Sequence, residues 1–327
     1  MTIKRVALLH DRFLSYIKYQ SPGNRQIVIW LCKNIAAAQH SIKHAKSTFT
    51  EKIDAAHYPE KNERMISMTT TNAALPLAGK KGLITGIAND KSIAYAVAKA
   101  IVDLGGEIAI TYQNDKTARY TQPLAEALGA KLFVKLDVAE PGSLEGVIAQ
   151  CGEAFGEIDF AIHSMAFCNA DDLHGRVIDA TEEGFDSAMN ISCHSFLRMA
   201  KALEPLMSHG GSLITMSYLG AERVVRNYGV MGIIKAALES AVRYMAYDLG
   251  PKGIRVFAVS PGPIMTRAAS GIANFNQLLE ADAAKAPLGR TVTIEEVGAL
   301  TAFLCTQGSS GMTGQTIYVD GGAHIVA

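Results

Sequence analysis

The sequence predicts an α/β protein with one doubly wound, mostly parallel sheet and helices on both of its faces. From about Leu77 onward, short apolar runs alternate with longer helical stretches, which is typical of repeated βαβ units. Apolar residues make up 49% of the chain and charged residues 19%, a balance that suits one large buried core. Right-handed crossovers between parallel strands would place the helices on both sides of the sheet.

The predicted strands are short and apolar, as buried parallel strands usually are. Helices are expected at residues 92–104 and around residues 124–128, between the first strands. The predicted strands are Lys81–Thr85, Glu107–Tyr112, Leu132–Leu136, Asp159–His163, Leu213–Met216, Arg255–Val259 and Thr316–Val319.

Residues 1–74 differ from the rest of the chain, and residues 75–327 are predicted to form the whole α/β domain. The first 50 residues contain one acid, Asp11, and a clear excess of Lys and Arg. Three interpretations stay open: a poorly ordered extension, a targeting segment, or an upstream stretch before a true start at Met65 or Met68.

Composition argues against several classes of function. The 31 basic and 31 acidic residues give a formal net charge of zero, so no strong field is available for nucleic acid. The longest apolar run near the N-terminus, residues 27–32, is too short for a membrane span. Five cysteines without a CxxC pair predict neither a disulfide framework nor a metal site, and they suit a reducing cytoplasm.

The turn after the first strand is a candidate site for a dinucleotide. Gly86 permits a tight turn, and Ser92 and Ile93 open the following helix, whose N-terminal amides could bind a pyrophosphate. Ser92 could cap the helix or bond a phosphate oxygen. The full GxGxxG pattern is missing, so an ordinary strand-to-helix turn explains this segment equally well.

The next strand ends extend the candidate cofactor site. Gln113 follows the second strand, where the adenosine ribose lies in such folds, and its uncharged side chain favours NADH over NADPH. Asp137 and Val138 follow the third strand, where Asp137 could accept from the adenine amino group or simply cap a turn. Ser164 and Met165 follow the fourth strand and would pass beside the cofactor, whereas His163 is expected to be a hydrogen-bonded core residue.

Tyr228 and Lys235 are the candidate reactive pair. They are seven residues apart, which places both on one face if the segment is helical. A Lys here could bind the nicotinamide ribose, and its charge would favour an electron-rich oxygen nearby. Tyr228 could then donate a hydrogen bond or a proton to a carbonyl oxygen.

Several motifs together resemble the NADH-dependent enoyl-[acyl-carrier-protein] reductases, a divergent branch of the short-chain dehydrogenase/reductase superfamily. The resemblance runs from about residue 75 to the end of the chain and predicts a Rossmann-type domain. Its motifs are Thr85-Gly86, Tyr112-Gln113-Asn114-Asp115, Asp137-Val138-Ala139-Glu140, Ser217-Tyr218-Leu219-Gly220-Ala221-Glu222, Tyr228-x6-Lys235, Gly262-Pro263-Ile264 and Val319-Asp320-Gly321-Gly322.

The resemblance implies a role for each matching residue. Tyr228 would bond the thioester carbonyl, Lys235 would hold the ribose, and Tyr218 would act beside them in the substrate site. Ile264 and Thr266 would contact the nicotinamide, and residues 268–279 would form a loop over the acyl chain. The remaining expected substrate contacts are Phe167, Cys168, Met231 and Phe275, of which the last two could equally be core residues.

The implied reaction is reduction of the trans-2 double bond of an enoyl thioester on acyl carrier protein, in the fatty-acid elongation cycle, by a cytoplasmic homotetramer. Alternatives are a short-chain-type 3-oxoacyl (carbonyl) reductase, which would use Tyr-x3-Lys, and a catalytically idle dinucleotide-binding protein. The chain departs from the family pattern at Asn190, Ile234, Phe257 and Pro261, and Ile234 is expected to crowd the cofactor.

Overall fold

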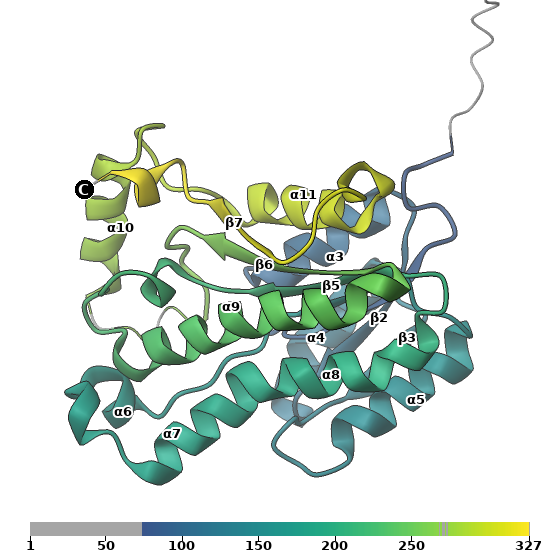
Figure 1. Ribbon diagram of the computed structural model, residues 1–327, viewed down its shortest axis with the longest axis horizontal. Helices are drawn as coiled ribbons and strands as arrows, with labels where there is room; N and C mark the ends of the chain where they lie inside the picture. The colour runs from purple at the N-terminus through teal and green to yellow at the C-terminus, as the bar shows by residue number, and fades with distance from the viewer. Residues whose placement is uncertain (1–73, 268, 270–271, 273, 327) are drawn as a thin grey trace, which may run out of the picture. The chain divides into compact units, whose positions relative to one another are not determined.

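The computed structural model describes residues 74–326 apart from residues 268, 270, 271 and 273 (Figure 1). The expectations for residues 1–73, and for those four positions of the predicted substrate loop, lie outside the described residues.

Seven parallel strands form one sheet in the order β3-β2-β1-β4-β5-β6-β7. All seven predicted strands are present, and their ends differ from the predicted ones by at most two residues, so the predicted fold class is confirmed. The strands are β1 Lys81–Ile84, β2 Glu107–Tyr112, β3 Leu132–Lys135, β4 Phe160–His163, β5 Gly211–Met216, β6 Ile254–Pro261 and β7 Gln315–Val319.

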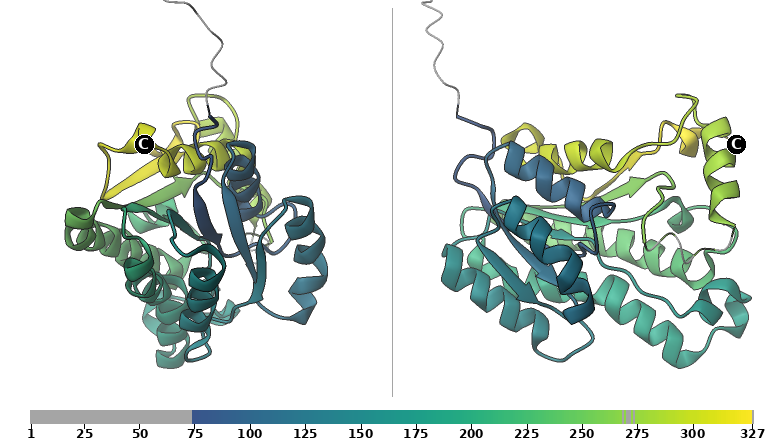
Figure 2. Two further views of the ribbon diagram at one scale, coloured as in Figure 1. Left: turned by 90° about the vertical axis from the view of Figure 1, so that its right-hand side faces the viewer. Right: turned by 180° about the vertical axis from the view of Figure 1, so that it is seen from behind.

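Helices connect the strands and form two layers around the sheet (Figure 2). Buried side chains of α3, α4 and α11 cover one face, and those of α5, α8 and α9 cover the other. The α-helices of the described residues are α3 Ile93–Asp103, α4 Asp115–Ala127, α5 Ser143–Phe155, α6 Ala170–His174, α7 Glu182–Met189, α8 Ser195–Leu203, α9 Gly229–Leu249, α10 Phe275–Lys285 and α11 Ile294–Cys305. Of the described helices, none is long and apolar enough to cross a membrane.

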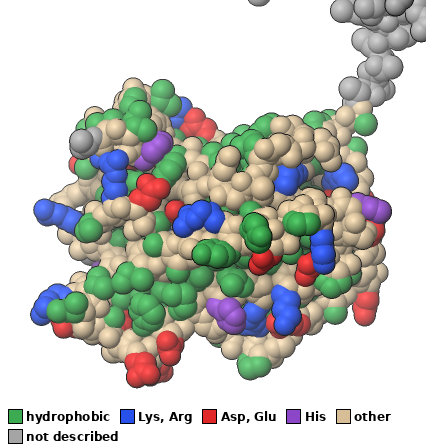
Figure 3. Space-filling view, in the orientation of Figure 1, with side chains coloured by type: hydrophobic (Ala, Val, Ile, Leu, Met, Phe, Trp, Pro, Cys, Tyr) green, Lys and Arg blue, Asp and Glu red, His purple; other side chains and the backbone are tan. Residues whose placement is uncertain are grey.

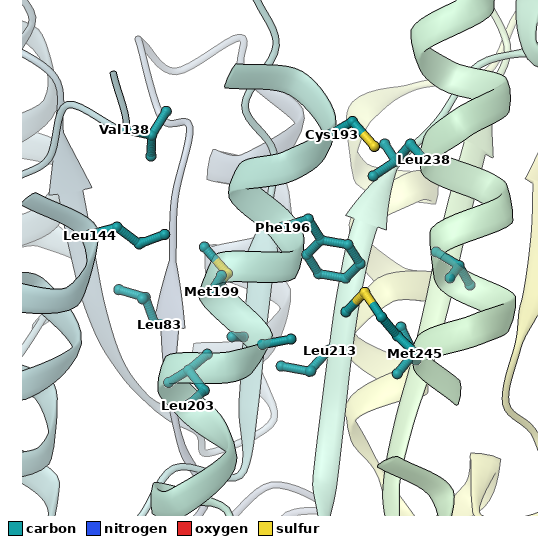
Figure 4. Close-up of a cluster of buried hydrophobic side chains, with 14 of the residues drawn as sticks. Leu83, Val138, Leu144, Cys193, Phe196, Met199, Leu203, Leu213, Leu238 and Met245 are labelled. Carbon is teal, nitrogen blue, oxygen red and sulfur yellow. The ribbon is translucent and has the colours of Figure 1, made fainter. Parts of the chain in front are cut away.

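The two cores follow from the alternation of side chains along each strand. On β5, Leu213 faces the α8 and α9 side while Ile214 faces the α3 and α11 side. Figure 4 shows Leu213 together with Phe196 and Met199 of α8 in the first of these cores. Both faces of the sheet are therefore buried, as the apolar strands predicted.

The strand order changes direction between β1 and β4. From β1 the chain moves outward to β2 and β3, and then returns to β4 on the other side of β1. In doubly wound sheets, ligands bind at the carboxyl edge of such a reversal. This edge is therefore where the candidate site is expected.

Candidate active site

The structure brings the predicted cofactor residues to one edge of the sheet. Because all strands are parallel, the segments after β1, β2, β3 and β4 leave the sheet on the same side. Gly86, Gln113, Asp137 and Ser164 lie in these four segments. The segments after β5 and β6, which contain the predicted reactive residues, continue the same edge.

The turn after β1 packs tightly against the segment after β4. Gly86 has φ +93°, and a Cβ atom placed on it would lie 1.9 Å from the carbonyl oxygen of Ser164. The backbone N–H and the hydroxyl of Thr85 both donate to the carbonyl of Ile162, at 3.0 and 2.9 Å. Only glycine fits this turn. Because glycine has no side chain, the backbone of the turn is accessible where a dinucleotide would lie.

Ser92 occupies the N-cap position of α3, but its hydroxyl does not cap the helix. The hydroxyl instead accepts from the backbone N–H groups of Ala88 and Asn89, at 3.0 and 3.1 Å. The predicted cap is therefore wrong, because the amides of the preceding loop take the oxygen. Ile93 begins α3, so its N–H is among the N-terminal amides that could meet an anion.

The ends of β2 and β3 present uncharged and acidic side chains respectively. Gln113 is exposed directly after β2. The Asp137 carboxylate accepts from the N–H of Ala139 at 3.0 Å, so it stabilises a local turn with one oxygen. Val138 is buried, and its carbonyl accepts from Arg198 at 3.0 Å, which anchors this loop to α8.

The segment after β4 is held in place by Ser192. The Ser192 hydroxyl accepts from the N–H of Phe167 at 2.9 Å and donates to its carbonyl at 3.1 Å. Met165 and Cys168 pack partly buried against the core, whereas the Phe167 side chain is 45% exposed.

His163 is a core residue, as expected. Its ring nitrogens contact the hydroxyls of Thr215 at 3.0 Å and Ser195 at 2.7 Å. Burial, with Lys235 adding to it, lowers the pKa of His163 to about 3, so the ring is neutral. Ser195 was not predicted, because it follows a π-helical turn, Asn190–His194, that hydrophobic periodicity does not reveal.

Tyr228, which is buried, and Tyr218, which is half-buried, form a pair at the end of β5. Their ring centroids are 4.9 Å apart in an edge-on arrangement, and Gly220 permits the approach, because a Cβ there would lie 2.5 Å from the Tyr228 ring. Burial is the main reason that both hydroxyls have raised pKa values. Each therefore stays protonated, and able to donate, throughout the ordinary pH range.

The expected helical position of Tyr228 is wrong. Helix α9 begins at Gly229, so Tyr228 is its N-cap residue, whereas Lys235 lies inside the helix. A Cβ on Gly229 would lie 2.7 Å from the carbonyl oxygen of Leu173, so α9 starts close against α6. This position turns the Tyr228 ring onto Tyr218.

Lys235 is buried, and its ammonium donates to the carbonyl of Met216 at the end of β5, at 2.7 Å. Burial lowers the pKa of Lys235 to about 8, while Cys193 and Glu239 oppose this shift. The Glu239 carboxylate accepts from the Ser217 hydroxyl, which ties α9 to the segment that carries Tyr218. An ammonium has three N–H donors, so Lys235 can bind further oxygens, such as ribose hydroxyls.

The remaining predicted residues lie after β6, in α9 and in α10. Ile264 and Thr266 form a turn in which the N–H of Thr266 donates to the carbonyl of Ile264 at 2.8 Å. Met231 belongs to the buried core around α8 and α9, and Phe275 begins α10 and is also buried. Ile234 is fully buried in the same core, which also contains Tyr228, and its crowding of the cofactor stays a prediction.

This geometry has the features of a dinucleotide-dependent reductase. The glycine turn meets the fourth strand at the sheet reversal, and a protonated Tyr pair and a buried Lys lie beside it. Within the described part of the chain, no group of His, Cys, Asp or Glu residues could hold a metal ion. The fold and the site together therefore define a reductase of the short-chain dehydrogenase type.

Comparison with known proteins narrows this class. The family model described as Enoyl-(Acyl carrier protein) reductase matches residues 86–324. Enoyl-[acyl-carrier-protein] reductase [NADH] FabI of Escherichia coli is 47% identical over 252 residues, which cover 77% of this chain and 96% of the relative. The corresponding Rhizobium meliloti protein is 46% identical over 76% of this chain and 91% of its own length.

Solved structures of enoyl-acyl-carrier-protein reductases resemble this chain in fold as well as in sequence. The enoyl-(acyl-carrier-protein) reductase of Anaplasma phagocytophilum, in complex with NAD, superposes with a TM-score of 0.75 and is 44% identical; the match covers 78% of this chain and 97% of that one. The Bacillus cereus enoyl-acyl carrier protein reductase, with NADP+ and an indole naphthyridinone, has the same TM-score and 40% identity over 77% and 99% of the two chains. The chain belongs to the enoyl-(acyl-carrier-protein) reductase family, and the resemblance noted in its sequence is confirmed.

Proposed function

We propose that this protein reduces the trans-2 double bond of enoyl-acyl-carrier-protein thioesters with NADH, as a step of the fatty-acid elongation cycle. The observation that carries the proposal is the edge-on Tyr218–Tyr228 pair at the carboxyl end of β5, where the Lys235 ammonium also binds. Curated relatives at 46–47% identity are named as NADH-dependent enoyl reductases, which supports both the reaction and the cofactor.

The residues present fit a nicotinamide dinucleotide. Gly86 leaves the turn after β1 without a side chain where its backbone packs against Ser164, and the Lys235 ammonium retains donors for ribose hydroxyls. The proposed cofactor contacts also include Ser92, Ile93, Asp137, Val138, Ser164, Met165, Ile264 and Thr266. The exposed, uncharged Gln113 supports NADH over NADPH, since no fixed charge there favours a 2′-phosphate.

When bound, NADH supplies a hydride to the β-carbon of the enoyl thioester. Tyr228 is protonated and donates a hydrogen bond to the thioester oxygen, where negative charge develops as the double bond is reduced. The positive charge of Lys235, held at the end of β5, would further stabilise that negative charge. The resulting enolate would take a proton from solvent at its α-carbon, which gives the saturated acyl chain, and Tyr218 orients the Tyr228 ring through the edge-on contact.

The acyl chain is proposed to lie between the segment after β4 and the start of α10. Phe167, Cys168, Met231 and Phe275 are the proposed contacts. The described part of the predicted loop leads into α10 at Phe275, whose side chain is buried. These contacts are the ones that would determine the preferred chain length.

The charge on Lys235 predicts how the reaction rate depends on pH. We expect kcat/KM to fall as pH rises through about 8, because the Lys235 pKa is about 8 and its charge is present only below that value. On the alkaline limb the fall should approach about tenfold per pH unit. His163 is neutral and both Tyr residues stay protonated, so they add nothing to this limb.

Steady-state kinetics across pH measures this limb in the wild type and in Lys235→Met. The variant should be less active at every pH and should lack the fall in kcat/KM that is centred near pH 8. If kcat/KM of the variant falls near pH 8 as it does in the wild type, the group that titrates is not Lys235.

The oligomeric state and location are further parts of the proposal. One face of α9 carries Ile233, Ala237, Ser240, Tyr244 and Tyr247, at the three- and four-residue spacing of a packing stripe. Tyr244 and Tyr247 are 73% and 83% exposed, and Figure 3 shows hydrophobic side chains gathered along this front face. Large exposed aromatic side chains support association of α9 with other copies in a homotetramer, which sedimentation equilibrium would test.

We also propose that the protein acts in the cytoplasm, where acyl carrier protein would be its partner.

The proposal is tested by the loss of NADH absorbance with crotonyl thioester and, separately, with acetoacetyl thioester. We expect loss with the first substrate only. Loss with acetoacetyl thioester alone would support the carbonyl reductase, and NADH binding without any loss would support the idle dinucleotide-binding protein. The same assay on protein that starts at Met68 tests the proposal that the reductase domain of residues 75–327 does not need the first 67 residues for activity.

A further inference from the structure

A small cavity lies beside Tyr218, where α10 meets the segments after β5, β6 and β7. Its volume of about 10 Å³ matches the space of about one water molecule. The cavity lining includes Tyr218, Ser260, Gly262, Asp282, Tyr318 and Asp320. Of these residues, only Tyr218 has been given a part in the reaction.

Three buried polar atoms of this cavity make no hydrogen bond with the described residues: Ser260 Oγ, Asp282 Oδ2 and the Tyr318 hydroxyl. The Glu222 carboxylate is close enough to Tyr318 to raise its pKa, after burial, but lies outside hydrogen-bond geometry. Ser260 is fully buried. Because buried polar atoms are nearly always satisfied, three of them around one cavity indicate a polar connection between α10 and the sheet.

Asp282 is the ionisable member of this group and comes from α10. Its Oδ2 lies 3.4 Å from the position that a Cβ on Gly262 would occupy, so the carboxyl group packs against the turn that leads to Ile264 and Thr266. The Asp282 charge also contributes to the raised pKa of Tyr218. Asp282 therefore touches the proposed nicotinamide turn and acts electrostatically on the proposed substrate site.

The charges around Asp282 favour its neutral form. Burial raises the pKa of Asp282, the Asp320 carboxylate after β7 raises it further, and Lys285 on α10 lowers it. Asp320 is itself bonded to His324, whose ring nitrogen lies 2.9 Å from Asp320 Oδ2. A neutral carboxyl group can donate to a water molecule in the cavity, which can also bond Ser260 and Tyr318, whereas a carboxylate here places a negative charge facing Asp320.

We propose that Asp282 is a positioning residue for the reduction: its protonated carboxyl group holds α10 against the sheet through a water molecule that it shares with Ser260 and Tyr318 in the cavity, and its ionisation loosens α10. Helix α10 begins at Phe275, a proposed acyl-chain contact, so docking of α10 determines how well the thioester binds. A carboxyl pKa that is higher in the docked state favours docking at low pH and weakens it as pH rises through that pKa. Each pKa unit between the docked and released states changes the docking equilibrium tenfold.

The first test compares thioester KM in the wild type, Asp282→Asn and Glu280→Gln from the ordinary range of an Asp carboxyl group, about pH 4, to about pH 8, at saturating NADH; its interpretation rests on the proposed function. We expect wild-type KM to rise with pH across this range while kcat changes less. Asp282→Asn mimics the neutral acid and should keep a low KM throughout. Glu280→Gln removes an exposed charge from the same helix and should keep the wild-type profile.

The second test does not depend on turnover. Hydrogen exchange of the α10 amides, corrected for the intrinsic effect of pH, should show protection that decreases with pH in the wild type and in Glu280→Gln but stays constant in Asp282→Asn. The same decrease in Asp282→Asn would overturn the proposal. Absence of turnover in all three proteins would count against the proposed function, and the exchange profiles would still decide the role of Asp282.

Discussion

Tyr228→Phe is expected to lower kcat by about 10²–10³, while the dissociation constant of NADH changes little. The hydroxyl is the proposed hydrogen-bond donor to the thioester oxygen, and its raised pKa keeps it protonated. The substitution leaves the ring in place, edge-on to Tyr218 at 4.9 Å. It therefore removes an interaction that matters most when charge develops on the substrate.

Stopped-flow or steady-state kinetics gives kcat, and fluorescence titration gives the NADH dissociation constant. Tyr120→Phe is the matched control, because it removes an exposed hydroxyl from α4 and should leave kcat unchanged. Full turnover in Tyr228→Phe would remove Tyr228 from the reaction. A parallel loss of NADH affinity would instead assign it to cofactor binding.

Gly86→Ala is expected to destabilise the fold by at least about 3 kcal/mol and to abolish NADH binding. The residue has φ +93°, a conformation that costs a side chain about 1–2 kcal/mol. The new Cβ would also lie 1.9 Å from the Ser164 carbonyl oxygen, which is backbone and cannot rotate away. The turn or the segment after β4 must therefore shift, and both lie at the proposed cofactor site.

Urea unfolding and NADH titration measure the two effects. Gly129→Ala is the matched control: Gly129 has φ +65°, but a Cβ there would meet no atom within 4 Å. Gly129→Ala should lower the stability only by the cost of a side chain at positive φ, and it should keep its affinity for NADH. Equal losses in the two variants would show that the contact with Ser164 is unimportant.

The fold was predictable because each strand is an apolar run with its own turn signal. Burial on both faces forces alternating side chains, such as Leu213 and Ile214, to be apolar alike, and the sequence shows this directly. Strand ends were less certain, since polar residues such as Gly211 and Ser212 begin β5 before its apolar run. The helical position expected for Tyr228 was wrong, because α9 starts only at Gly229, where a tertiary contact with α6 sets its first residue.

The site was predictable only in part. Tyr218, Tyr228 and Lys235 stand out because their types and spacing suit carbonyl chemistry at a strand end. Ser92 was misread because local loop amides compete for its hydroxyl. Asp282 and Ser260 gave no signal, since the cavity that joins them forms from segments that are distant in sequence.

The central claim is that a hydride moves from the nicotinamide to the β-carbon of an enoyl thioester. The most direct measurement uses NADH that carries deuterium at C4, in each of its two stereochemical forms, with crotonyl thioester and analysis of the product by NMR and mass spectrometry. We predict a saturated butyryl thioester with one deuterium at the β-carbon from one of the two forms. A product without deuterium at that carbon, or no reduction of crotonyl thioester while acetoacetyl thioester is reduced to a deuterated alcohol, would contradict the claim.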